Sequence, residues 1–205
     1  DLGGYIEKEE NLSHDGNAWV YDNAWVYGNA KVYGNAWVFD NAKVCGDAKV
    51  CGNAWVCGNA EVCGNAWVCG DAKVYGNAKV CGDALVYDNA WVFDNALVCG
   101  NAEVFDNAKV CGNAEVFDNA KVYGNAKVYG NAKVCGDALV CGDALVCGDA
   151  DYTTVKGFGI EFRTTTFFKC KDGVTRVKCG CFYGDLGEFR EQVKNTRSGK
   201  IAEEY

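Results

Sequence analysis

Cysteine is the residue type of this sequence with the greatest potential for chemistry, since 14 of the 205 residues are cysteines. Between residues 43 and 74 the chain reads KVCGDAKVCGNAWVCGNAEVCGNAWVCGDAKV, with a thiol at every sixth position from Cys45 to Cys69. Thiols at a regular spacing can bind a metal ion, form disulfides, or serve as small apolar side chains of a repeating surface. The one histidine of the chain, His14, lies outside this stretch. The choice among the three depends on the elements that hold the thiols.

A six-residue period runs through about two thirds of the chain. Ala recurs every six residues from Ala18, and Val follows two positions later at 22 successive places, from Val20 to Val146. In a strand, Ala and Val two positions apart point to the same side, whereas a helix would scatter them around its axis. Each unit closes with a pair such as Gly-Asn or Asp-Asn, which favours a turn. The pattern predicts short strands joined by two-residue corners over residues 16–151.

Units such as VYGNAK and VCGNAE resemble the repeats of the hexapeptide-repeat left-handed β-helix family. The resemblance implies an all-β fold, a left-handed parallel β-helix with three hexapeptides in each 18-residue turn, and about seven turns. We divide the chain into an N-terminal cap (residues 1–15), the β-solenoid (16–151) and a small α+β module (152–205). Within the cap, Leu12 and His14 are expected at the Ala and Val places of the motif, with His14 filling the end of the coil.

Outward side chains 18 positions apart should lie above one another, so they can be sorted by face. One face collects four of the six tryptophans. We call its aromatic residues the aromatic stripe: Trp19, Tyr21, Trp37, Phe39, Trp55, Tyr75, Trp91 and Phe93. Stacked rings can simply stabilise neighbouring turns, or they can form a surface on which another protomer, a partner protein or a sugar lies. We predict the stripe as the interaction surface.

A second face carries what we call the thiol column: Cys45, Cys63, Cys81 and Cys99. Disulfides between stacked cysteines are disfavoured, because side chains in register leave the backbone in parallel and rarely reach the required torsion. A metal is disfavoured as well, because structural zinc needs four ligands around one point and a column spreads them along a line. Reduced thiols that serve as small apolar surface residues are the favoured interpretation, and we expect no metal and no cofactor.

The corner residues support the 18-residue register independently. In the second corner position of the units, no two aspartates are 18 residues apart, whereas asparagines often are. Ladders of identical side chains suit asparagine and penalise carboxylates. The distribution of Asp and Asn is therefore what a coil with 18 residues per turn requires.

The composition changes after Asp151. In FFKCKDGVTRVKCGCF, Asp172-Gly173 predicts a two-residue hairpin turn. That pairing puts one set of residues on one face of the hairpin, namely Thr166, Phe168, Cys170, Thr175, Val177 and Cys179. It puts the basic residues on the other face, namely Lys169, Lys171, Arg176 and Lys178. Buried structural thiols are the favoured interpretation of the cysteines here.

A short amphipathic helix should follow the hairpin and pack on it. Asp185 is a candidate N-cap with Glu188 three residues later, and Leu186, Phe189 and Val193 share one stripe. The string TTTFFKCKDGVTRVKCGCFYGDLGEF resembles a C-terminal segment of uncharacterised proteins of gut bacteria and their phages. That resemblance implies no known activity.

Charge and hydropathy restrict the partners. The formal net charge is −8, and the negative excess lies in the first 151 residues, so nucleic acid is not an expected partner. No apolar run approaches the roughly 20 residues of a membrane span, and we expect no membrane contact. A cytoplasmic location is favoured. An extracellular or virion-associated location stays open, because the first residue is not a Met and so is not the start of translation.

Catalysis is not expected. Members of the resembled family include acyltransferases and zinc carbonic anhydrases, which place histidines on the coil and often insert loops, and neither feature occurs in residues 16–151. We predict a non-catalytic structural β-solenoid that self-assembles into a homo-oligomer or filament, with the C-terminal module as a cap or oligomerisation element. The alternative is a phage- or bacterium-encoded binding module for a host protein or a small ligand. A hexapeptide acyltransferase-like enzyme is the least favoured of the three.

Overall fold

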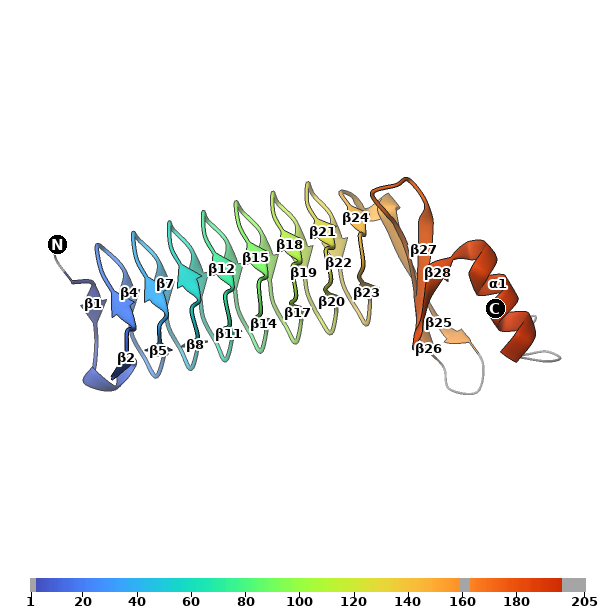
Figure 1. The fold of residues 1–205 in the computed structure, drawn as a ribbon. Coiled ribbons are helices and arrows are strands. Elements are labelled where there is room, and N and C mark those ends of the chain that lie inside the picture. Colours follow the sequence, from blue (N-terminus) through green and yellow to red (C-terminus); the bar gives the residue numbers. More distant parts are fainter. Residues whose placement is uncertain (1–2, 159–162, 197–205) are drawn as a thin grey trace.

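The computed structural model describes residues 3–158 and 163–196 of the protein. These residues form a long parallel β-solenoid that is closed at one end by an antiparallel sheet and a helix (Figure 1). The N-terminal strand lies at the opposite end of the solenoid from the helix. Among the described residues, none of the helices has the length and apolar character that a membrane crossing needs.

The solenoid consists of three parallel sheets with eight strands each. Sheet 1 contains β1 (Tyr5–Ile6), β4 (Trp25–Val26), β7 (Lys43–Val44), β10 (Glu61–Val62), β13 (Lys79–Val80), β16 (Leu97–Val98), β19 (Glu115–Val116) and β22 (Lys133–Val134). Sheet 2 contains β2 (Leu12–Gly16), β5 (Lys31–Gly34), β8 (Lys49–Val50), β11 (Trp67–Val68), β14 (Leu85–Val86), β17 (Glu103–Val104), β20 (Lys121–Val122) and β23 (Leu139–Val140). Sheet 3 contains β3 (Trp19–Val20), β6 (Trp37–Val38), β9 (Trp55–Val56), β12 (Lys73–Val74), β15 (Trp91–Val92), β18 (Lys109–Val110), β21 (Lys127–Val128) and β24 (Leu145–Val146).

The predicted 18-residue register is confirmed throughout the repeat. Trp37 pairs with Trp55, and Val38 pairs with Val56 one turn later. Side-chain amides in the corners form ladders with the same spacing, as in the hydrogen bond of 3.0 Å from Asn59 Nδ2 to Asn77 Oδ1. An aspartate can accept such a bond but cannot donate the next one. This explains why asparagines stack on one another in the second corner position and aspartates do not.

Alanine and valine fill the interior of the coil, as the period predicts. From Ala24 to Val140 the Ala and Val residues of the repeat are no more than 1% exposed. Burying one valine side chain contributes roughly 1.5 kcal/mol or more. Each turn stacks its valines on those of the next turn, so the interior is one continuous column of packed side chains. This column makes the walls rigid and places the outward residues in fixed files.

The first corner position explains the choice between Gly and Asp. The backbone there has a positive φ, for example +69° at Gly52, and a Cβ on Gly52 would lie 2.8 Å from the amide nitrogen of Gly70. At four of the aspartates that occupy the position, the carboxylate compensates with a hydrogen bond to the next turn. Asp40, at φ +59°, accepts a bond of 2.9 Å from the backbone N–H of Gly58.

The solenoid has about eight turns, one more than the repeat alone predicts, because the residues before position 16 form a further turn. β1 pairs with β4, and β2 pairs with β5. The predicted register of this turn is wrong by two residues, since Leu12 pairs with Val32 and so takes the Val place. Asn11, in the 3-10 helix Glu9–Asn11, is buried, and its side-chain amide donates to the carbonyls of Gly28 and Ala30 at 3.1 and 2.7 Å. His14 does not fill the coil; its side chain is exposed and lies 3.3 Å from Glu9.

The C-terminal module is a four-stranded antiparallel sheet followed by one helix. The sheet has the order β25 (Tyr152–Phe158), β26 (Arg163–Lys169), β27 (Thr175–Cys179) and β28 (Phe182–Asp185), and the 3-10 helix Asp149–Asp151 precedes it. Helix α1 (Leu186–Thr196) begins with the predicted cap, in which the N–H of Glu188 donates to Asp185 Oδ1 at 2.8 Å. Phe189 is buried against the sheet, but Leu186 is 47% exposed, so its predicted packing is wrong.

The predicted faces of the hairpin are also wrong. Phe168 pairs with Arg176, and Lys169 pairs with Thr175 across a loop of residues 170–174, which shifts the register by one position. Such a shift moves the side chains of one strand to the opposite face relative to the other strand. Phe168 and Cys170 therefore pack into the core of the solenoid, whereas Val177 and Cys179 pack under the helix. The basic residues do not share one face either, because Arg176 lies beside Phe168.

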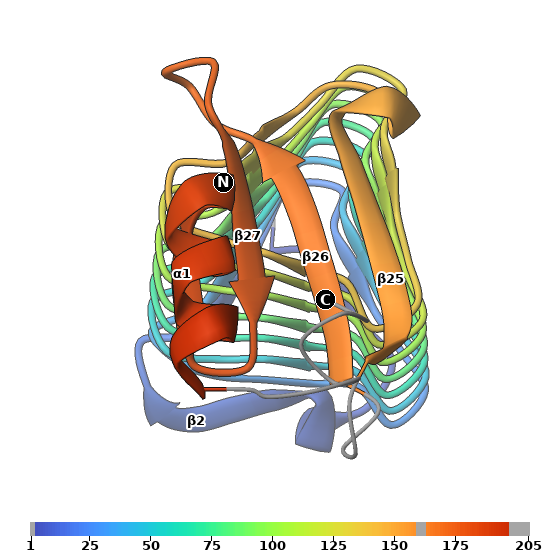
Figure 2. The ribbon, with the colours of Figure 1, turned by 90° about the vertical axis from the view of Figure 1, so that its right-hand side faces the viewer.

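This sheet lies across the end of the coil. Phe168 is 1% exposed, and Thr166 Oγ1 accepts a hydrogen bond of 3.0 Å from the N–H of Leu139 in the last turn. The N–H of Cys135 donates to Tyr152 Oη at 3.3 Å. Figure 2, viewed from this end, shows β25, β26 and β27 in front of the coil with α1 beside them on the outer side. The last turn of the solenoid is thus covered by the module.

Candidate functional site

The aromatic stripe lies on the outer side of sheet 3, where the repeat predicts it. Trp37 and Trp55 stack with ring centroids 5.9 Å apart and an interplanar angle of 9°. Tyr21 and Phe39, at the positions after β3 and β6, stack at 5.0 Å and 6°. Because the rings are held one turn apart by the backbone ladder, stacking costs little extra order. In the N-terminal half of the stripe, four rings form one continuous layer, namely Tyr21, Trp37, Phe39 and Trp55.

In the C-terminal half of the stripe, lysine side chains lie over the tryptophan rings. Tyr75 and Phe93 stack at 5.0 Å, but Lys73 occupies the tryptophan file between Trp55 and Trp91. The Lys73 ammonium lies 4.5 Å from the ring centroid of Trp55 and 5.2 Å from that of Trp91. Lys109 approaches the other side of Trp91 at 4.3 Å. These cation–π contacts hide Trp91 in part and leave its half of the stripe more polar.

Exposure confirms this difference within the stripe. Trp19, Trp37 and Trp55 are 57%, 41% and 39% exposed, whereas Trp91 is half-buried. Indole rings that are this exposed on a rigid wall are unusual in a monomer and typical of a contact surface. The most exposed indole rings of the stripe therefore lie in its N-terminal half.

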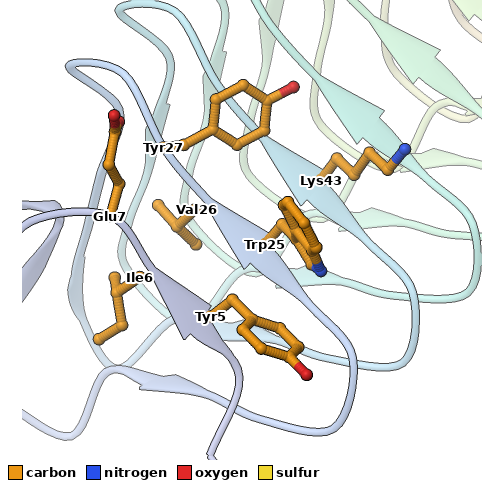
Figure 3. Close-up of a pocket in the computed structure, with 7 residues that line it drawn as sticks. All are labelled: Tyr5, Ile6, Glu7, Trp25, Val26, Tyr27 and Lys43. Atoms are coloured by element: carbon orange, nitrogen blue, oxygen red, sulfur yellow. The ribbon is translucent and has the colours of Figure 1, made fainter.

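A second aromatic group, which the repeat pattern does not predict, lies near the N-terminus. A shallow groove on sheet 1 is lined by seven residues: Tyr5, Ile6, Glu7, Trp25, Val26, Tyr27 and Lys43. The rings of Tyr5 and Trp25 lie side by side at 5.3 Å, and Lys43 extends beyond the indole (Figure 3). Tyr5 could not be placed from the repeat, because the turn that carries it is two residues longer than the others.

The thiol column lies outward on the side of sheet 1, as predicted. Its members Cys45, Cys63, Cys81 and Cys99 each follow a strand of that sheet, and all four are free and half-buried. Burial, with help from the neighbouring Cys81 and Glu61, raises the pKa of Cys63 to about 12. Such a thiol stays protonated near neutral pH and behaves as a small apolar side chain.

One pair of thiols on another face differs from the column. Cys51 and Cys69 follow β8 and β11 of sheet 2. A hydrogen bond from the Cys69 thiol lowers the pKa of Cys51 to about 6, against the effect of burial, and Tyr33 and Lys49 act in the same direction. The same bond raises the pKa of Cys69. A lowered pKa favours reaction at Cys51 over a protonated thiol such as Cys63, because the thiolate is the nucleophilic form.

We expect Cys51 to react first with iodoacetamide at pH 7. Its thiolate predominates above pH 6, whereas burial and the nearby Asp40 raise the pKa of Cys57 to about 11. The rate at Cys51 should fall about tenfold for each pH unit below 6, as the thiolate fraction falls. Brief labelling followed by peptide mass spectrometry measures both effects. The variant Cys69→Ala removes the donor and should slow the reaction; equal labelling of Cys57 and Cys51 would contradict the assignment.

Comparison with known proteins assigns no function to these surfaces. Neither a protein-family model nor a curated protein matches the chain. The resemblance to hexapeptide-repeat proteins thus depends on the residue pattern, and what is shown is a parallel β-solenoid of about eight turns with an antiparallel sheet and a helix at its C-terminal end.

Proposed function

We propose that the protein is a non-catalytic structural β-solenoid of the hexapeptide-repeat type, which assembles side by side into a homo-oligomer through the aromatic stripe. The single observation that carries the proposal is the exposure of Trp19, Trp37 and Trp55 on one flat wall. Tryptophan and tyrosine are enriched among the residues that dominate binding energy at protein interfaces. A straight wall offers the same file of rings to a second copy of itself.

The closed C-terminal end supports a finite oligomer in preference to a filament. Stacking coils end to end requires a free sheet edge at both ends of the molecule. The antiparallel sheet covers the last turn, with Phe168 and Cys170 packed into the coil. Association through a side wall does not need these edges. A reducing compartment such as the cytoplasm suits a surface with many free thiols.

Light scattering after size-exclusion chromatography tests the proposal. The wild-type chain should elute as an oligomer whose mass is a small multiple of 22.1 kDa. The triple variant Trp19→Lys, Trp37→Lys, Trp55→Lys should elute as a monomer, because the charges cannot be buried against a second copy. Circular dichroism should show the same strand content in both proteins, since these side chains point away from the core.

A matched variant makes the test specific to the stripe. Trp67 is 40% exposed but lies on sheet 2, so Trp67→Lys should leave the oligomer intact. A wild-type protein that stays monomeric at high concentration would overturn the proposal. Loss of strand content in the triple variant would instead assign the stacked rings to stabilising neighbouring turns.

A binding module for a protein or small ligand is the second candidate function, and the N-terminal groove favours it. Tyr5 and Trp25 offer 60% and 51% exposed rings in a groove that Lys43 also lines. Aromatic walls with a few polar groups are typical of ligand sites. A monomeric wild-type chain in the measurement above would favour this candidate.

A further inference from the structure

A cluster of metal-ligating side chains lies on sheet 1, away from the aromatic stripe. The sulfur atoms of Cys45 and Cys63 and a carboxylate oxygen of Glu61 all lie within 4.8 Å of one another. Cys45 follows β7, and the other two residues belong to β10 and its end. The strands pair directly, and the N–H of Cys45 donates to the carbonyl of Val62 at 2.9 Å. Two adjacent turns of a rigid coil therefore hold the three donor atoms together.

We propose that Cys45, Glu61 and Cys63 bind a divalent thiophilic cation with a filled d shell, of which Zn²⁺ is the biological representative. Thiolate sulfur and carboxylate oxygen are both zinc ligands, with bonds of about 2.3 Å and 2.0–2.2 Å. Donor atoms of a tetrahedral site with these bonds lie about 3.6–3.8 Å apart. Rotations about the bonds of the three half-buried side chains can bring the donor atoms from their present separations, up to 4.8 Å, to these shorter distances. Three protein ligands leave the fourth position to water.

The site revises the expectation drawn from the sequence. A column of thiols spreads its sulfur atoms along a line, which disfavours a metal. The structure adds a donor beside the line, because Glu61 lies two residues before Cys63 on the same outward side, and one of its carboxylate oxygens is within 4.8 Å of both sulfur atoms. Two stacked thiols and one carboxylate form a triangle, and a triangle can surround an ion.

The charges around the cluster suit the loaded site. Binding of the cation displaces the protons of both thiols to the solvent, and the resulting two thiolates, one carboxylate and divalent cation together carry one negative charge. The Lys79 ammonium lies 3.3 Å from Glu61 Oε1, and Lys43 is the residue level with Glu61 on the neighbouring strand of the preceding turn. Cys81 and the hydroxyl of Tyr27, which is hydrogen-bonded to Cys45, are the other titratable groups that face the cluster. The two lysines offset the net negative charge of the loaded site.

The same sheet contains a matched site that lacks one donor. Glu115 lies in the same file as Glu61, and Lys133 is 3.2 Å from it, as Lys79 is from Glu61. Cys99 takes the place of Cys45, but Phe117 takes the place of Cys63. One carboxylate and one thiol remain there, which is too few ligands for a zinc site. Glu115 is therefore the natural control for Glu61.

The test uses the full chain, reduced and free of metal. Zn²⁺ affinity is measured by competition with a chromophoric chelator, and X-ray absorption of the protein with one equivalent of zinc counts its ligands. We expect two sulfur and two oxygen ligands. Cys63→Ser should weaken binding at least about 100-fold. A residue that only orients a metal ligand costs up to about 100-fold when it is replaced, so a larger loss indicates a direct ligand. Glu61→Gln keeps a side-chain oxygen but removes the ligand's charge, so it should weaken binding at least about 10-fold, whereas Glu115→Gln and Cys51→Ser should leave the affinity unchanged.

Three results would overturn the proposal. Zinc bound by four sulfur atoms would place it on other thiols of the chain. An equal loss of affinity in Glu61→Gln and Glu115→Gln would show that the carboxylates act only through general charge. Unchanged affinity in Glu61→Gln and Cys63→Ser would remove the site altogether. If Cys63→Ser fails to fold, Glu61→Gln still decides, because this outward side chain is not part of the core.

Discussion

Replacing Val128 with Asp should unfold the solenoid, whereas the same replacement at the preceding Lys127 should be tolerated. Val128 is fully buried between Val110 and Val146 in the column that fills the coil. An unpaired charge in such a place costs about 3–5 kcal/mol or more. Lys127 lies on the same strand but points outward, beside Lys109 of the neighbouring turn. A carboxylate there meets water and a positive neighbour.

Chemical denaturation followed by circular dichroism measures this difference. The free energy of unfolding should fall by about 3–5 kcal/mol or more in Val128→Asp and by less than about 1 kcal/mol in Lys127→Asp. Because each turn contacts only its neighbours, the loss should also broaden the transition as turns on the two sides of the defect unfold separately. Equal destabilisation by the two variants would show that the coil does not have the inside and outside described here.

The same contrast between inside and outside explains why the solenoid could be predicted from its sequence. Ala and Val alternate with variable residues at a fixed period, and the corner requires Gly, or an Asp that can bond the next turn. Both constraints are local, so each hexapeptide carries them. The file assignments followed from the register alone, and Trp37 does lie against Trp55.

The ends of the coil could not be predicted in this way, because nothing repeats there. Asn11 is buried and its amide donates to two carbonyls of the next turn, and Leu12, the residue after it, lies two positions from its predicted place. In the hairpin, Asp172 accepts a hydrogen bond from the N–H of Val174 and pairs with Arg176, which lengthens the loop beyond two residues. Such bonds depend on three-dimensional neighbours that the sequence pattern does not show.

The position of the aromatic stripe could be predicted from the sequence, but the exposure of its individual rings could not. The register placed all eight residues of the aromatic stripe on one wall. That Lys73 would cover Trp55 and Trp91 depends on how a long side chain bends. The carboxylate of Glu61 could have been found from the register, since its file lies beside the thiol column. The spacing of the cysteines alone does not show this carboxylate, because Glu61 lies in the file next to the thiol column and not in it.

Replacing Phe168 with Asp should convert the protein into a chain that associates end to end. Phe168 is 1% exposed and is the largest side chain that the C-terminal sheet inserts into the end of the coil. A carboxylate there opposes docking of the sheet on the solenoid. Undocking uncovers the last strands of all three sheets, and a parallel sheet edge is a template for another chain. The first strands of a second molecule, β1, β2 and β3, are the opposite edges of the same three sheets and can continue them.

The outer face of the same sheet supplies the control that separates undocking from simple damage to the module. Phe189 is buried between the helix and the sheet, on the side away from the coil. Phe189→Asp should loosen the helix but leave the sheet on the end of the solenoid, so its oligomeric state should match that of the wild type. Light scattering and negative-stain imaging should show elongated assemblies for Phe168→Asp alone, growing with protein concentration. If both variants form them, or neither does, the sheet is not the element that keeps this end of the coil from pairing.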